Sequence, residues 1–209
     1  GDSYASFVAT DNYAGGRKAG ELLAGLLGGR GRVAMLRYQE GSASTQAREQ
    51  GFLDAVAGNT GIEVVSANQY GGATTETAYK AGENLLAAWR KGDQQLQIDG
   101  LFCPNESTTF GMLRALQDNG YAGKVKFVGF DSSAMLAQAL EEGHIHGLVL
   151  QDPMNMGYLG VATMVRHLRG QPVEKRIDTG SAVVTPENMR EPRNQKLLNP
   201  DYAVWLKDQ

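Results

Sequence analysis

Two spacings of apolar residues alternate along the chain, and each predicts a different kind of element. Short runs rich in β-branched and aromatic residues predict strands, whereas longer segments with apolar residues three and four positions apart predict helices. The predicted strands are residues 5–9, 33–38, 63–70, 98–103, 125–130 and 145–151. The predicted helices are residues 13–27, 45–57, 75–91, 107–119, 133–142 and 154–169.

Capping and turn residues support these boundaries. Asp11 and Asn12 precede the first predicted helix, where an N-cap is needed, and Pro153 lies near the start of the last one. Glycines that suit a left-handed C-cap follow the helices, namely Gly28, Gly92, Gly120, Gly143 and Gly170. This regular alternation predicts parallel strands joined by right-handed crossovers, with helices on both faces. The predicted fold class is therefore α/β, with a doubly wound open parallel sheet.

The alternation stops after residue 170. Residues 177–184 predict one further strand, and a polar, irregular tail with Pro192, Pro200 and Trp205 follows it. This tail has too few apolar residues to form a core of its own. We therefore expect it to pack on something else, either another part of this chain or sequence that is absent from it.

Composition and charge narrow the function classes. Hydrophobic residues make up 42% and charged residues 21% of the 209 residues, which is usual for a soluble globular protein. The net charge of −3 gives no attraction to nucleic acid or to an anionic membrane. No apolar run approaches the roughly 18 residues of a membrane helix, and residues 1–4 do not resemble a signal peptide.

Cysteine and histidine offer little chemistry. Cys103 is the single cysteine, so an internal disulfide is excluded, and its apolar surroundings predict a buried residue of a strand. His144 and His146 would share one face of a strand, but no third metal ligand is evident. We therefore expect solvent-exposed histidines at a sheet edge, no metal site and no cofactor.

Polar residues follow nearly every predicted strand. In open α/β sheets, ligands bind beyond the carboxyl ends of the strands, so these residues share one rim. They are Gly41, Arg48, Tyr70, Asn105, Glu106, Asp131 and Gln151. Any one of them could simply be a loop or capping residue. Together, their guanidinium, amide and carboxylate groups suit vicinal hydroxyls, and a tyrosine can stack on a sugar ring. The rim therefore predicts a polyol-binding site.

Six segments also resemble, in the same order, the bacterial solute-binding proteins of the ribose-binding type. They are residues 9–20 (ATDNYAGGRKAG), 47–52 (AREQGF), 100–106 (GLFCPNE), 128–131 (VGFD), 151–157 (QDPMNMG) and 185–188 (TPEN). Each segment alone is a weak signal, but the series covers almost the whole chain. The family has a periplasmic-binding-protein-like fold of type I, with two lobes that close on a sugar.

The resemblance implies a role for each matching residue. Arg48 is expected to hold ring or anomeric oxygens through a two-pronged hydrogen bond, and Asn105, Asp131 and Gln151 are expected to hold hydroxyls. No residue is expected to be catalytic.

Three further residues match the family less directly. Tyr70 falls near a family aromatic residue, but the loop after it is longer here. Glu106 stands where many relatives have aspartate, so it either reaches the ligand differently or only caps a helix. Gly41 would let the backbone approach the sugar.

The resemblance also implies a domain organisation. Residues 1–151 are expected to form the second, C-terminal sugar-binding lobe with its hinge strands, and residues 152–209 to return to the first lobe. The N-terminal part of that first lobe, roughly 100 residues or one typical domain, would precede this sequence. We expect the chain without it to expose apolar surface and to self-associate.

The implied function is that of a solute-binding component of a bacterial ABC sugar-uptake system. Its partners would be a monosaccharide or related polyol and a membrane permease or receptor, with no nucleic acid. The location would be periplasmic or extracellular, with or without a lipid anchor.

Two other classes of function stay open at this point. Effector domains of lac-repressor-type transcription regulators, and sugar sensors, share the fold. An enzyme is disfavoured, because the sequence has neither a phosphate-binding P-loop nor a Gly-x-Ser-x-Gly elbow.

Overall fold

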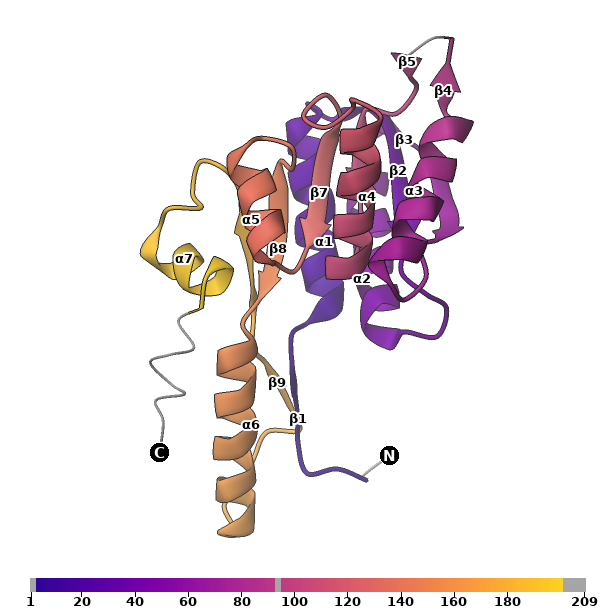
Figure 1. Ribbon diagram of the computed structural model, residues 1–209. Coiled ribbons are helices and arrows are strands. Elements are labelled where there is room, and N and C mark those ends of the chain that lie inside the picture. The colour runs from indigo at the N-terminus through magenta and orange to yellow at the C-terminus, as the bar shows by residue number, and fades with distance from the viewer. Residues whose placement is uncertain (1–2, 93–94, 201–209) are drawn as a thin grey trace.

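The computed structural model describes residues 3–92 and 95–200, and the predicted features of the tail beyond residue 200, including Trp205, lie outside them. The main body is a six-stranded sheet in the order β10-β8-β7-β6-β2-β3 (Figure 1). Its strands are β2 (Arg30–Arg37), β3 (Gly61–Tyr70), β6 (Gly100–Phe102), β7 (Lys126–Phe130), β8 (Gly147–Gln151) and β10 (Ser181–Val184). All neighbours are parallel except β10, which runs antiparallel to β8.

Helices cover both faces of this sheet, so the predicted doubly wound α/β fold is confirmed. One face carries α1 (Asn12–Leu26) and α2 (Ala43–Ala57). The other carries α3 (Thr75–Ala88), α4 (Glu106–Asp118) and α5 (Ala134–Glu141).

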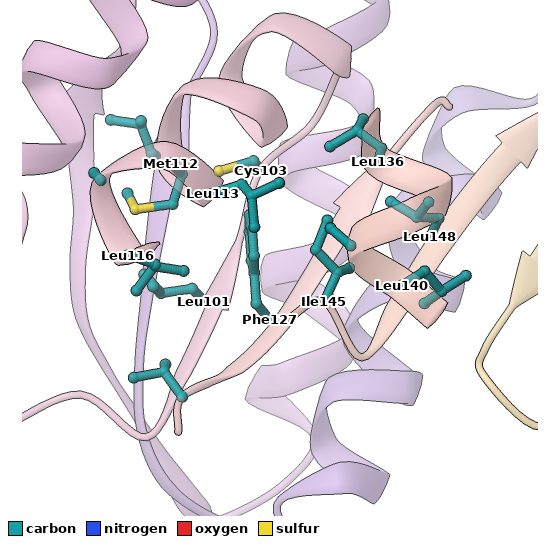
Figure 2. Close-up of a cluster of buried hydrophobic side chains, with 14 of the residues drawn as sticks. Leu101, Cys103, Met112, Leu113, Leu116, Phe127, Leu136, Leu140, Ile145 and Leu148 are labelled. Atoms are coloured by element: carbon teal, nitrogen blue, oxygen red, sulfur yellow. The ribbon is translucent and has the colours of Figure 1, made fainter. Parts of the chain in front are cut away.

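The sheet has one hydrophobic core on each face, because successive side chains of a strand point to opposite faces. In β2, Val33 and Met35 join the cluster that includes α1 and α2, whereas Ala34 and Leu36 join the cluster on the opposite face. Figure 2 shows the second cluster, which is the one on the face covered by α3, α4 and α5. In it, side chains from α4 and α5 lie against Phe127 and Leu148 of the sheet. Both faces of the central strands are buried, in agreement with the helices predicted on both faces of the sheet.

Cys103 belongs to the second cluster and is fully buried directly after β6. Burial raises the pKa of its thiol far above the ordinary value, so the thiol stays protonated and unreactive.

A smaller part projects from the carboxyl-end rim of the large sheet (Figure 1). It consists of α6 (Pro153–Leu168) and a two-stranded parallel sheet of β1 (Phe7–Ala9) and β9 (Arg176–Asp178). The chain crosses between the two parts three times, near residues 10–11, 152 and 179–180.

The single strand predicted over residues 177–184 is wrong. Gly180, with φ +79°, breaks it into β9 and β10, which belong to different sheets. A glycine with a left-handed backbone occurs both in a single bulged strand and in the turn between two strands. Only the strands with which residues 177–184 pair distinguish the two cases.

Two other elements also differ from the prediction. The helix predicted over residues 75–91 ends at Ala88, and the chain continues into β4 (Arg90–Lys91), which pairs antiparallel with β5 (Gln95–Leu96). The tail predicted as irregular contains α7 (Pro192–Leu198), whose Leu198 is buried with Met189 in the cluster beneath α4 and α5.

The tail therefore packs on the described chain itself. Since β10 and α7 pack with the large sheet, the part of residues 152–200 that stands apart from it consists of α6 and β9, together with β1. The predicted domain boundary between residues 151 and 152 stays a prediction. Within the described ranges, every helix is too short or too polar to cross a bilayer.

Candidate functional site

The site begins with the close packing of α1 on α2. A Cβ atom on Gly16 of α1 would overlap the carbonyl group of Arg48, and one on Gly51 of α2 would overlap the carbonyl group of Tyr13. The two glycines let the helix backbones touch. This contact brings the first turn of α1 beside Arg48 at the carboxyl-end rim of the sheet.

Arg48 is the centre of the polar network. Its Nε donates a 2.8 Å hydrogen bond to Oδ1 of Asn12, and its Nη1 donates to the carbonyl oxygen of Pro104 at 2.9 Å. Nη1 also lies 3.5 Å from Oδ2 of Asp131. The hydrogen bonds described for this side chain leave Nη2 free to donate to a ligand.

The guanidinium of Arg48 also packs against an aromatic ring. Its central carbon lies 3.9 Å from the centre of the Phe130 ring, which is a close cation–π contact. The residue is only 5% exposed. Burial lowers the pKa of Arg48, and the nearby carboxylate of Asp131 partly offsets that effect. Arginine remains charged under such conditions, so the site presents a rigid, partly desolvated cation.

Asp131 follows β7 in an unusual backbone conformation. Its φ is +66°, and no other non-glycine residue in the described ranges has a positive φ. Strained backbone conformations of this kind concentrate at functional sites. The carboxylate accepts a 2.6 Å hydrogen bond from Nε2 of Gln151 at Oδ1, while Oδ2 faces Arg48. The structure thus brings together three of the predicted residues.

Asn105 lies next to Pro104 on the same rim and caps α4. Its Oδ1 accepts hydrogen bonds from the backbone N–H and the hydroxyl of Thr108, and its Nδ2 donates to the Ser107 hydroxyl at 3.1 Å. Because the capping oxygen is already used, the amide nitrogen is the part of Asn105 best suited to a ligand.

The remaining predicted residues, Tyr70, Glu106 and Gly41, lie outside this network. Tyr70 ends the edge strand β3, and its ring faces the guanidinium of Arg37 at 5.0 Å. Glu106 is the exposed first residue of α4, where a carboxylate complements the helix dipole. Gly41 has φ +85° in the loop before α2, with open space around it. Ligand contacts of these three residues stay predictions.

Two residues of the network were missed by reasoning from sequence. Asn12 was interpreted as a capping residue, but the side chain that caps α1 is that of Asp11, which accepts from the backbone N–H of Ala14. Phe130 was counted only as a strand residue. Asp11 alone caps α1, so a second polar residue directly after it was the sign in the sequence that Asn12 has another role.

The two histidines have structural contacts. Nδ1 of His146 accepts a hydrogen bond from the backbone N–H of Phe127 at 3.2 Å, and Nδ1 of His144 lies 3.3 Å from Nε2 of Gln117. Both histidines are partly buried, so the expectation of two solvent-exposed histidines is wrong. Residues 3–92 and 95–200 contain no cluster of three or more His, Cys, Asp or Glu residues suited to a metal ion.

A large hollow lies beside this network rather than within it. It measures about 1000 Å³ and touches the network only at Gln151. Its other walls include Tyr158 and Val161 of α6 and Leu197 of α7. Since these walls are mostly apolar, the hollow suits packing against polypeptide better than binding a polyol.

Comparison with known families and proteins agrees with the fold. A family model described as "Periplasmic binding protein domain" matches residues 1–172. The ribose import binding protein RbsB of Haemophilus influenzae is 32% identical over 180 residues, covering 86% of this chain and 58% of that protein. The D-allose-binding periplasmic protein of Escherichia coli is 30% identical over 166 residues, covering 79% of this chain and 51% of that protein. The chain thus spans a little over half the length of these relatives, both of which are named for sugar binding.

Solved structures of similar proteins extend this comparison. A carbohydrate transporter solute-binding protein from Agrobacterium radiobacter, in complex with D-arabinose, is 34% identical with a TM-score of 0.86, over 95% of this chain and 67% of that one. An ABC transporter solute-binding protein from Agrobacterium vitis with bound D-fucose is 34% identical with a TM-score of 0.85, over 93% of this chain and 65% of that one. With its doubly wound lobe and the match over most of its length, the chain belongs to the periplasmic binding protein family.

Proposed function

We propose that this chain supplies one jaw of a two-lobed clamp for a monosaccharide, in the solute-binding component of a bacterial ABC uptake system. The observation that carries the proposal is the Arg48–Asp131–Gln151 network. Asp131 and Gln151 lie at the carboxyl ends of two neighbouring strands, and Arg48 of α2 contacts Asp131 at the same rim. A buried guanidinium with one free nitrogen suits a neutral, hydroxyl-rich ligand, because Asp131 already balances its charge.

Each residue of the network has a distinct role in this proposal. Nη2 of Arg48 donates to ring or anomeric oxygens of the sugar, and the carboxylate of Asp131 accepts from hydroxyl groups. Oε1 of Gln151 accepts as well, since its amide nitrogen is held by Asp131. Asn105 donates through Nδ2. Because these groups are held by the protein before the sugar arrives, little conformational entropy is lost on binding.

The second jaw would be formed by polypeptide that continues the small part of the structure. A two-stranded sheet such as β1–β9 is marginal alone, and both of its outer edges lack strand partners within the described residues. Beside it, α6 exposes large apolar side chains, including Tyr158 at 71%, Val161 at 68% and Leu168 at 76%. A first lobe that extends the β1–β9 sheet would bury this face.

The relatives support the same ligand class. Their names and bound molecules include ribose, D-allose, D-arabinose and D-fucose, all of them monosaccharides. The D-allose relative is named as periplasmic, and we assign the same compartment to this protein.

The proposed mechanism is closure about the three crossing segments. The sugar stabilises the closed form because both lobes then contact it, and the open form offers only half of those contacts. A membrane permease would recognise the closed form. No bond of the sugar is made or broken.

A thermal-shift screen of the full-length protein tests this function. D-ribose, D-allose, D-arabinose, D-tagatose and D-fucose are compared with amino acids and nucleosides at equal concentration. A sugar at 1,000 times its Kd should stabilise the folded state by about 4 kcal/mol, which is a clear rise in Tm. A shift with amino acids or nucleosides alone would contradict the proposal.

A further inference from the structure

We propose that Asn12 is a positioning residue that sets the orientation of Arg48 from the first crossing segment. This inference rests on the proposed function, because it concerns how the ligand-binding guanidinium is held. Asn12 is the first residue of α1 and lies directly after the segment that leaves β1.

Asn12 and the proposed ligand use different nitrogens of Arg48. Oδ1 of Asn12 accepts from Nε at 2.8 Å, whereas the nitrogen left for a ligand is Nη2. The ring of Phe130 fixes the plane of the guanidinium, and the carbonyl oxygen of Pro104 fixes Nη1. Neither contact holds the Nε side. Asn12 therefore supplies the remaining point that stops the guanidinium from rotating within its plane.

The side chain of Asn12 is itself anchored to the crossing segment. Its Nδ2 donates to the carbonyl oxygen of Thr10 at 3.1 Å, which settles which end of the amide faces Arg48. The Thr10 hydroxyl in turn lies 3.4 Å from the Thr179 hydroxyl and donates to the carbonyl oxygen of Gly180 at 3.3 Å. Two of the three crossing segments are thus connected to Arg48 through this one amide.

The energetic reason follows from burial. An unpaired N–H of a buried arginine is costly, so loss of the Asn12 oxygen should make the side chain rearrange. The Nε–H lies on the same edge of the guanidinium as one N–H of Nη2, so loss of the Asn12 oxygen leaves an unpaired donor beside the nitrogen proposed to bind the sugar. Asn12 should therefore affect sugar binding without touching the sugar.

Three variants of the full-length protein test the proposal. Asn12→Leu keeps the size of the side chain and removes the acceptor. Asn12→Asp replaces the Nδ2 donor to Thr10 with an oxygen but keeps an acceptor for Nε, and the charge-assisted contact with the guanidinium should rescue the slow exchange. Tyr13→Phe is the matched control, because it removes another 2.8 Å hydrogen bond between α1 and α2, from the Tyr13 hydroxyl to Asp54.

The direct readout is the NMR signal of the Arg48 Nε–H in the sugar-free protein, identified by its loss in Arg48→Lys. In Asn12→Leu, exchange of this proton with water should become at least about tenfold faster, as expected when one buried hydrogen bond is lost. Asn12→Asp and Tyr13→Phe should keep the slow exchange. The Kd for the sugar that most raises Tm among the five named above should rise about tenfold in Asn12→Leu only.

Two results would overturn the proposal. One is a folded Asn12→Leu protein whose Arg48 Nε–H exchanges as slowly as in the parent. The other is a loss of sugar affinity with unchanged exchange, because Asn12 would then act on the sugar itself. If Asn12→Leu does not fold, faster exchange in Asn12→Asp than in Tyr13→Phe contradicts the proposal and slow exchange in both supports it. Because the exchange readout needs no sugar, failure of the proposed function would be seen separately, as the absence of any Tm shift.

Discussion

Gln151 and Asp131 meet across two neighbouring parallel strands, with Nε2 of Gln151 donating to Oδ1 of Asp131 at 2.6 Å. Gln151 ends β8 directly before the chain crosses to α6, so this hydrogen bond ties a crossing segment to the carboxylate that faces Arg48. The carboxylate is thus oriented by both neighbours. Under the proposed function, this preorganisation lets a weak ligand group such as a hydroxyl be held firmly.

The glycine contact between α1 and α2 yields a stability prediction. Gly16→Ala places a methyl group on the Arg48 carbonyl and should destabilise the protein by about 1–3 kcal/mol, as overpacking does. It should also weaken sugar binding by displacing the Arg48 backbone. Gly25→Ala is the control on the same helix, because its added Cβ would meet nothing within 4 Å.

Gly25→Ala should instead stabilise the protein by about 0.5–1 kcal/mol through helix propensity alone. Urea unfolding followed by circular dichroism measures both values. Equal effects of the two substitutions would show that the α1–α2 contact is not tight.

The sequence alone predicts the architecture well, for a physical reason. The apolar periods and glycine stops mark nearly every element of the large sheet, because the central strands are buried on both faces. The break at Gly180 could not be predicted, since whether residues 177–184 form one strand or two depends on pairing partners far away in sequence. For the same reason β1 was predicted as a strand without its separate sheet.

The site is predictable only in part. The rule that ligands bind at the carboxyl ends of parallel strands groups Arg48, Asp131 and Gln151 correctly on one rim. The supporting contacts of Asn12 and Phe130 depend on the helix packing through Gly16, which no local pattern reveals. The left-handed conformation of Asp131 is likewise invisible in sequence, because aspartate is common in ordinary turns.

His146 provides a pH-dependent prediction. Burial, together with nearby Lys126, lowers the pKa of His146 from 6.5 to about 4 in the folded state. Between these two values the unfolded chain binds a proton that the folded protein does not, so stability is complete above pH 6.5 and falls as the pH drops toward 4.

Substitution of His146 by asparagine tests this dependence. His146→Asn keeps an acceptor for the Phe127 N–H without the titration, so the fall in the free energy of unfolding between pH 7 and about pH 4.5 should be smaller than in the parent. Denaturant unfolding at each pH measures the difference. His167→Asn, at an exposed position in the last turn of α6, is the control. An identical pH profile for His146→Asn and the parent would contradict this account.

Asp178 connects two of the crossing segments, and we predict that it stabilises their backbone locally. Its Oδ1 accepts 2.8 Å hydrogen bonds from the backbone N–H groups of Asp11 and Gly180. Asp178→Ala removes both, and hydrogen exchange of these two amides should become at least about tenfold faster, while β7 is unaffected. Asp178→Asn retains an oxygen acceptor and should stay close to the parent. Faster exchange spread evenly over β7 and β8 would instead indicate general destabilisation.

The claim that Arg48 and Asp131 form the sugar-binding half-site is tested most directly by isothermal titration calorimetry of the full-length protein. The titrant is the monosaccharide that gives the largest thermal shift, and the variants are Arg48→Ala and Asp131→Ala, each checked for cooperative unfolding. Both variants should lose at least about 2–3 kcal/mol of binding free energy, or roughly 30- to 150-fold in Kd, because a buried charge-assisted contact disappears. Unchanged affinity in both folded variants would contradict the assignment.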